Sequence, residues 1–375
     1  MYRWANNSDL AAIKKLWAND FEAYEPYFSW YFKEGYLPER TLCYFADNTL
    51  AAMLQLAPYK LKLRGAELPI HYYVGVVTDP AFRGLGLGHA LLQYTEQWLR
   101  QKGSAAAFFY TDIPRYYQPL GYRHCYQLKT LQLADEALTE LATSQTDGGW
   151  RHIDWRLEWP VLDAIYQKMI RNYEGCILRT AADWFYYLGE QECDGAQILS
   201  LSGQAYLVAV QNKETLRIME LGFAEPRQIP QALAAAARLA KSKGLFCLEW
   251  AAPADIAVIL PQFAAAGWQT KPFVMARLLD WPNILQTIKY PPALTGYLDL
   301  TIADERHIFE LKNGTAQIVG KPTTENSIEL GIAALTQLVL GVPNWAEEEA
   351  ALSTEQKKWL AECFPPLNTW INEYT

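Results

Sequence analysis

The sequence has little of what metal sites and disulfide frameworks need. Its six cysteines and five histidines are scattered, with no Cys-x-x-Cys or Cys-x-x-His spacing, which argues against a metal site. Reduced structural thiols are the expected state of the cysteines. His124 and Cys125 are neighbours, but adjacent side chains point apart on most backbones. That pair is therefore weak evidence for a cysteine nucleophile.

Basic runs, long apolar runs and a secretory signal pattern are also missing. The net charge is −8 without a lysine or arginine cluster, which makes nucleic acid a poor partner. The start, Met1 to Trp4, lacks a signal peptide's pattern, and no apolar run reaches membrane-spanning length. We therefore expect a cytoplasmic protein without a membrane partner. The diffuse acidic charge suits cationic partners such as polyamines, aminoglycosides or lysine side chains, and solubility alone is the other explanation.

Apolar residues, by contrast, are plentiful. Hydrophobic residues make up 51% and aromatic residues 14% of the 375 positions, enough to build large cores and to argue against disorder. At roughly 150 residues per domain, the length predicts two or three domains.

The most informative segment is Arg83-Gly84-Leu85-Gly86-Leu87-Gly88, which lies between an apolar run and a helix-like stretch. A strand that turns through glycines into a helix leaves unpaired N–H groups where the macrodipole adds positive charge. Such a cradle most often binds a pyrophosphate, and Arg83 adds a cation at its mouth. The glycine spacing fits neither a dinucleotide fold nor a Walker A loop. A glycine-rich turn without a ligand is the alternative.

Together with Thr78-Asp79-Pro80 before it, this loop resembles the acetyl-CoA loop of the GNAT superfamily of N-acetyltransferases. The family pattern Arg/Gln-x-x-Gly-x-Gly/Ala is filled by Arg83, Gly86 and Gly88. The resemblance implies that amides from Leu85 to His89 hold the CoA pyrophosphate and that the strand before the loop pairs with the pantetheine arm. The cofactor-binding residues that it implies are Val76, Val77, Thr78, Arg83, Gly84, Leu85, Gly86, Gly88 and His89.

A second match to the family follows in the segment from Tyr116 to Tyr122. The family has a tyrosine, three residues, a glycine and an aromatic residue, filled here by Tyr117, Gly121 and Tyr122. The resemblance implies that the Tyr117 hydroxyl lies beside the thioester sulfur and protonates the departing thiolate, on which negative charge builds. An aromatic turn packed under the sheet is the alternative. The register of Gly121 selects Tyr117 over Tyr116.

Residues 1–145 are predicted to form the catalytic GNAT domain, in an α+β order. Ser8-Asp9 is the expected cap of a first helix. Residues 41–78 are typical of three strands with turns at Asp47-Asn48 and Arg64-Gly65. The loop, a helix through about Lys102, a strand near 105–111 and the short Tyr117 helix complete the order.

An aromatic segment at residues 21–32 follows the first helix. Core packing is its default interpretation. In the GNAT family this region roofs the acceptor channel, and its interleaved acidic residues suit a pocket for a cationic amine. Candidate substrate-binding residues are Glu22, Glu25 and Trp30.

Residues 146–285 repeat part of this order. They have a hairpin pattern near 206–220, an alanine-rich helix at 228–243, a strand at 245–249 and a short helix closing on Gly267. In place of the glycine loop stands Ala224-Glu225-Pro226-Arg227, where a carboxylate replaces the glycines. We interpret the unit as a degenerate GNAT-like domain that no longer binds CoA, with chance similarity as the alternative.

Residues 286–375 form the third predicted domain. Leu298, Leu300 and Ile302 alternate as in a strand, and Asn313-Gly314 predicts a hairpin turn. A helix from Ser327 to Leu340 is expected to stop at Gly341. The segment resembles a trimmed sterol-carrier-like domain.

The order of the three domains resembles the enhanced intracellular survival (Eis) family of bacterial acetyltransferases. That resemblance implies a homo-oligomer, a hexamer, in which the terminal carboxylate, here that of Thr375, reaches into the first domain's active site. Trp370, Ile371 and Tyr374 are apolar anchors for such a tail. An ordinary packed C-terminus is the alternative.

These observations predict direct acetyl transfer from acetyl-CoA to a primary amine of a cationic small molecule, aminoglycoside- or polyamine-like, or of lysine. Catalysis would use Tyr117 and Thr375, with no metal and no covalent enzyme intermediate. A non-catalytic CoA-binding sensor or scaffold is the first alternative. A lipid carrier that uses the last domain is the second.

Overall fold

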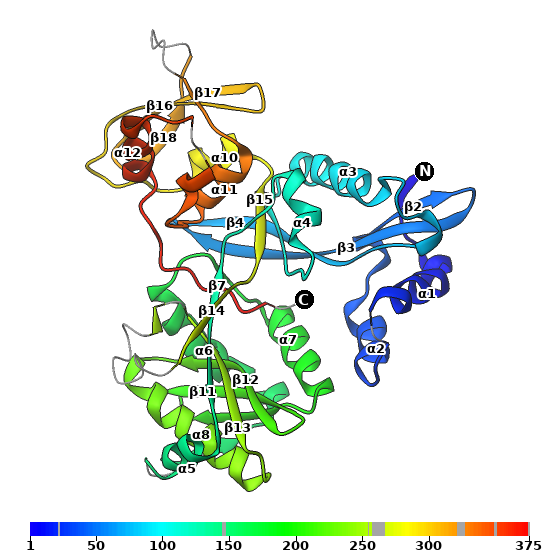
Figure 1. The fold of residues 1–375 in the computed structure, drawn as a ribbon, viewed down its shortest axis with the longest axis vertical. Helices are drawn as coiled ribbons and strands as arrows, with labels where there is room; N and C mark the ends of the chain where they lie inside the picture. The colour runs from blue at the N-terminus through cyan, green and yellow to red at the C-terminus, as the bar shows by residue number, and fades with distance from the viewer. Residues whose placement is uncertain are drawn as a thin grey trace.

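The computed structural model describes residues 1–21, 23–144, 148–253, 255, 256, 267–320, 327–348 and 351–373. Within these residues the strands form three sheets that helices cover, an α+β fold of several units (Figure 1). No helix in this part of the chain is both long and apolar enough to span a bilayer. The helices are α1 (Leu10–Asp20), α2 (Tyr27–Trp30), η2 (Tyr31–Gly35), α3 (Leu87–Gln101), α4 (Pro114–Tyr117), α5 (Asp135–Thr143), α6 (Trp155–Met169), α7 (Ala181–Cys193), α8 (Ile229–Ser242), α10 (Trp281–Thr287), α11 (Ile332–Val339) and α12 (Thr354–Cys363).

The first sheet carries the long hairpin predicted for residues 41–78. Asp47, Asn48 and Arg64 have positive φ angles, as tight hairpin turns require, so both predicted turns are confirmed. Asp9 is the N-cap residue of helix α1, as expected, but its side chain does not cap that helix. It pairs with Arg3 and closes a capping box with Asn6 at the short 3-10 helix Asn7–Asp9. The strand order is β1 (Tyr2–Trp4), β2 (Thr41–Ala46), β3 (Thr49–Leu63), β4 (Ala66–Thr78), β5 (Ala106–Phe109), β15 (Met275–Leu278) and β6 (Arg123–His124), with β9 (Cys176–Ile177) paired to β3.

The second sheet and the first exchange strands. Strand β7 follows β6 in the chain but pairs in the second sheet, whereas β15 returns to lie between β5 and β6. The unit boundaries expected at 145 and 285 therefore do not coincide with the sheets. Strand pairing depends on contacts between residues far apart in the sequence, and local sequence patterns do not predict such contacts. The order is β14 (Gln269–Pro272), β7 (Gln127–Leu133), β13 (Cys247–Ala252), β12 (Thr215–Phe223), β11 (Ala205–Asn212), β10 (Gln197–Leu201) and β8 (Arg151–His152).

The predicted elements of the second unit are largely present. The hairpin β11–β12 and the alanine-rich helix α8 lie where the patterns placed them. Most of the short helix expected before Gly267 falls at 257–266, outside the described residues.

The third unit is a small sheet with α10, α11 and α12 nearby. Leu298, Leu300 and Ile302 are buried as predicted, and Gly341 ends α11 with a φ of 76°. The expected helix starts later than Ser327: residues 328–329 pair in parallel with β16, and Gly331 caps α11. The likeness to a sterol-carrier domain stays a prediction. The strand order is β18 (Thr315–Ile318), β17 (Glu305–Lys312), β16 (Gly296–Ile302) and β19 (Ile328–Glu329).

The tip of the β3–β4 hairpin docks on the third unit through Arg64. Its guanidinium donates to the carbonyls of Val339 (2.8 Å), Leu338 (3.0 Å) and Pro365 (2.9 Å). A cation at the last carbonyls of α11 is favoured by the helix dipole. Burial lowers the pKa of Arg64 to about 10.

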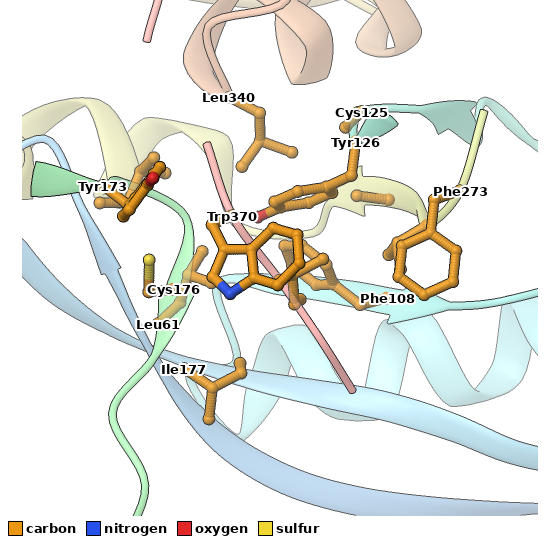
Figure 2. Close-up of a cluster of buried hydrophobic side chains, with 14 of the residues drawn as sticks. Leu61, Phe108, Cys125, Tyr126, Tyr173, Cys176, Ile177, Phe273, Leu340 and Trp370 are labelled. Carbon is orange, nitrogen blue, oxygen red and sulfur yellow. The ribbon is translucent and has the colours of Figure 1, made fainter. Parts of the chain in front are cut away.

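The C-terminal segment runs from the third unit between the other two and ends beside α7 (Figure 1). Figure 2 shows Trp370 surrounded by side chains of all three units, among them Phe108, Cys176 and Leu340. The Trp370 amide donates to the Glu174 carbonyl over 3.1 Å. The tail is thus part of the core that joins the units.

Candidate active site

The first sheet splays open beside β4. The parallel pairing of β4 with β5 ends at Tyr72 opposite Phe108, although β4 continues to Thr78. The β3–β4 register also shifts near Met53, and Gly75 adopts a φ of 59°. A Cβ there would lie 2.9 Å from Cε3 of Trp17, so only glycine fits this bulge.

The splay opens into a cavity of about 980 Å³. Of the residues expected to bind a cofactor, Val76, Thr78, Arg83, Gly84, Gly86, Gly88 and His89 line it. Val77 is buried and Leu85 is 67% exposed, and neither side chain lines the cavity. The main-chain roles expected for these two residues stay predictions.

The glycine loop forms the start of α3. Gly84 and Gly86 have φ angles of 77° and 74°, and Gly86 is the N-cap of the helix. The first amides of α3 have no intrahelical acceptor. A Cβ at Gly84 or Gly86 would meet nothing within 4 Å, so open space lies in front of this end of the helix. The start of α3 therefore has the geometry that an anion cradle needs, and the binding of a pyrophosphate there stays a prediction.

Gly88 has a packing role that the sequence did not reveal. A Cβ at this position would collide with the Tyr116 hydroxyl and lie 3.3 Å from Oγ1 of Thr78. Tyr116 is also held by His89, whose Nε2 donates to the Tyr116 carbonyl over 2.9 Å. Gly88 therefore lets α4 approach the first turn of α3.

Arg83 lies at the mouth of the cavity, as expected. Its Nε donates to the Thr78 carbonyl over 3.0 Å, and its guanidinium pairs with Asp20 at the end of α1. About half of its side chain is exposed. The cation therefore stands beside the cradle with one face open to solvent.

Tyr117 ends α4 and lines the same cavity as the cradle. Its ring packs against Phe109, with centroids 4.3 Å apart, and against Tyr116. Burial, followed by the nearby Tyr116, raises the pKa of Tyr117. Its hydroxyl therefore stays protonated at neutral pH and can donate a proton or a hydrogen bond.

Another part of the cavity wall is aromatic and acidic. Trp17, Phe21, Tyr24 and Tyr27 line it together with Glu190 of α7. Burial, and secondarily Asp194, raise the pKa of the Glu190 carboxyl to about 8. Sequence reasoning missed Glu190, because no local motif indicates that a helix of the second unit reaches the first unit's cavity.

Two of the three substrate-binding candidates in the 21–32 segment, Glu25 and Trp30, do not line the cavity. Glu25 is exposed and accepts from the Ser29 hydroxyl over 2.7 Å. Trp30 packs against Tyr186 and Gly189 of α7, and neither lines the cavity. Trp30 instead fixes α2 against the second unit. Glu22 lies outside the described residues.

The end of the chain is held close to this site by a buried ionic network. Arg179 donates to Glu373 over 3.0 Å and to both oxygens of Glu220 over 2.9 and 2.7 Å. The Tyr72 hydroxyl donates to the Glu373 carbonyl over 3.0 Å. The tail is thus anchored through residue 373, whereas Thr375 lies outside the described residues.

The remaining candidate chemistry finds no geometric support. Burial raises the pKa of the Cys125 thiol, which disfavours the thiolate that a nucleophile needs. In the second unit, Glu225 occupies the turn before α8, hydrogen-bonds Gln228 and pairs with Arg227. Across the described ranges, no three His, Cys, Asp or Glu residues are grouped to hold a metal ion.

Comparisons with known proteins support this geometry. Residues 1–125 match the acetyltransferase (GNAT) domain family, and no curated protein matches the sequence. The fold is similar to that of a GCN5-related N-acetyltransferase from Anabaena variabilis (17% identity, TM-score 0.83, all of both chains covered). It is also similar to one from Kribbella flavida (16%, 0.81, 100% of this chain and 98% of that chain) and to Eis1 from Mycobacterium abscessus (15%, 0.77, all of both chains). The first third of the chain thus matches a GNAT acetyltransferase domain, and the chain as a whole shares the fold of these three structures.

Proposed function

We propose that this chain, built as an Eis-like GNAT protein, transfers acetyl directly from acetyl-CoA to a primary amine of a cationic small molecule or of lysine. The observation that supports this most is that one cavity is lined by the cradle before α3, the splayed end of β4 and Tyr117. Binding of the extended CoA part of acetyl-CoA needs the cradle and the splayed strand, and departure of the thiolate needs a proton donor such as Tyr117.

The residues present fit CoA. Open space lies beside Gly84 and Gly86, and the first amides of α3 together with Arg83 are suited to a pyrophosphate. The backbone of residues 76–78 would pair with the pantetheine arm. Acetyl-CoA supplies an activated acetyl group, and the protein supplies its position.

In the reaction, the acceptor's ammonium first loses a proton to solvent, and the neutral amine nitrogen then forms the new C–N bond while the C–S bond breaks. Tyr117 gives its proton to the sulfur, and a proton from the amine nitrogen replaces it. Holding both reactants in one cavity supplies proximity without a covalent enzyme intermediate. We also propose that the terminal carboxylate of Thr375 orients the acceptor. With a pKa of about 3.5, it is a feeble base toward an alkylammonium near 10.

Free thiol release tests the proposal. The protein would be incubated with acetyl-CoA and, separately, with polyamines, aminoglycosides and lysine peptides. We expect amine-dependent thiol release that decreases strongly in Tyr117→Phe. Tight CoA binding without thiol release from any amine would support the sensor or scaffold instead.

A further inference from the structure

Glu190 and Tyr117 line the same cavity but come from different surroundings: Tyr117 packs against Phe109 and Tyr116, whereas the helix of Glu190 packs against α2 and η2. The charge of Glu190 contributes to the raised pKa values of Tyr24, Tyr27 and Tyr31. The pKa of Tyr117 is raised by burial and by Tyr116, with no contribution from Glu190. The carboxyl thus acts electrostatically on the tyrosines of the aromatic wall, two of which, Tyr24 and Tyr27, line the cavity with it.

Glu190 is a carboxyl without a counter-ion. It lies in the last turns of α7, which packs against α2 and η2, and the neighbouring Gln191 side chain offsets part of the rise in its pKa. Among the described residues no lysine, arginine or histidine pairs with it. Asp194, four residues further along the chain, adds a second negative charge that raises the pKa of Glu190 further.

Glu190 also lines a second, small cavity, and the polar groups of that cavity do not neutralise its carboxyl. They line a small adjoining cavity and include Arg179. Arg179 is already paired with Glu220 and Glu373. The other members are Tyr59, Asp183, Tyr186, Tyr187 and Glu373.

The walls next to Glu190 suit an organic cation. Tyr24 and Tyr27 are stacked, with centroids 5.3 Å apart, and Trp17 contacts Phe21 at 4.8 Å. Aromatic faces attract ammonium groups, and the attraction grows as water is excluded. A lone carboxyl behind aromatic rings therefore fits an alkylammonium better than a metal ion or a neutral ligand.

We propose that Glu190 binds an ammonium group of the acceptor remote from the nitrogen that is acetylated, so that the enzyme selects acceptors with two or more amino groups. The inference rests on the proposed function and assigns a specificity-determining residue to it. With one amine at the Tyr117 end, the cavity holds the second at its acidic end.

Binding of such an acceptor is coupled to ionisation of Glu190. With a pKa of about 8, the free carboxyl is roughly nine-tenths protonated at pH 7. An entering ammonium favours the carboxylate, and the pKa falls. A diamine therefore displaces a proton from Glu190 into solvent as it binds at pH 7.

The first experiment compares a diamine with the monoamine of equal chain length. We expect the wild type to favour the diamine in kcat/KM and Glu190→Gln to reduce that preference at least tenfold. The KM for acetyl-CoA should stay unchanged. The control is Glu192→Gln, in the same helix, whose carboxylate pairs with exposed Arg156. An undiminished preference in Glu190→Gln would overturn the proposal.

The second experiment needs no turnover. The CoA-bound protein would be titrated with the diamine at pH 7 in two buffers of different ionisation enthalpy. We expect proton release by the wild type and by Glu192→Gln, and none by Glu190→Gln. Equal release by all three proteins would refute the role of Glu190. Absence of thiol release from every amine would instead refute the proposed function, whatever the calorimetry shows.

Discussion

Nε of Arg179 donates to Oε1 of Glu373 over 3.0 Å, and 1% and 6% of the two side chains are exposed. The same guanidinium holds both oxygens of Glu220 in the second sheet. The backbone carbonyl of Glu373 also accepts a hydrogen bond from the Tyr72 hydroxyl of β4. Glu373 is therefore the residue that fixes the tail between the two units. The described end of the tail is therefore fixed at Glu373, which lines the small cavity that also includes Glu190.

Arg179→Met should destabilise the protein strongly. The change leaves Glu220 and Glu373 buried without their cation, which costs about 3–5 kcal/mol. Urea unfolding measures the loss. Arg156→Met is the control, because its pair with Glu192 is exposed and is worth about 0–1 kcal/mol. Equal losses in the two variants would contradict the prediction.

Extending the chain beyond Thr375 should impair acceptor turnover more than acetyl-CoA binding. Added residues would displace the terminal carboxylate while the anchor at Glu373 keeps the tail in place. Steady-state kinetics and calorimetry with CoA separate the two effects. The same extension placed before Met1, which is exposed, is the control. Full activity of the C-terminally extended protein would rule out a role for the carboxylate.

Gly86→Ala should weaken CoA binding at least tenfold. The new Cβ would project into the open space of the cradle and obstruct the approach of phosphate to the amides. The positive φ adds a strain of roughly 1 kcal/mol, so the fold is retained with a small loss of stability. Gly103→Ala is the matched control, because Gly103 has a φ of 79° and equally open surroundings. Calorimetry with CoA should separate the two variants, and equal affinities would refute the cradle.

Tyr117→Phe should lower kcat about 10²-fold with acetyl-CoA affinity retained, since a proton donor of this kind contributes at least that factor. Tyr116→Phe is the comparison, because it tests the register chosen from Gly121. Since the pKa of Tyr117 is raised by burial, no loss of rate from its ionisation is expected near neutral pH. The prediction fails if the two variants have the same kcat.

Glu190→Gln should stabilise the protein relative to wild type at pH 8 more than at low pH. A folded pKa of about 8 above an unfolded value of about 4.3 means that the wild type loses stability as pH rises between them, by at most about 1.4 kcal/mol per unit. Below that window both side chains are neutral. Denaturant unfolding at several pH values across this window measures the free energy of unfolding of both proteins. The same pH dependence for the two would contradict the prediction.

The hairpin of the first sheet could be predicted from sequence because turn chemistry is local. Asp47-Asn48 and Arg64-Gly65 mark positions that need positive φ, and the strand ends beside Arg64-Gly65 alternate in burial. Gly86 is equally local, since it combines the N-cap of a helix with a left-handed backbone. These features supplied the cofactor half of the site.

The acceptor half could not be predicted in the same way. Glu190 reaches the cavity only because α7 packs against α2, with Trp30 lying on Gly189. Such contacts are set by tertiary packing between units, which leaves no pattern within either segment. For the same reason, Glu25 and Trp30 looked like wall residues and lie elsewhere.

The position of β15 has a consequence for how this enzyme can be divided. Its residues Met275 to Leu278 fill the gap between β5 and β6, far beyond the 125 residues that match the acetyltransferase domain. A fragment ending near residue 145 would leave β5 with a bare edge and β7 without its neighbours, an invitation to aggregate. The segment that sequence comparison recognises, residues 1–125, is therefore shorter than the segment that completes the first sheet. Transferring only the shorter segment to another protein would leave the active-site domain incomplete.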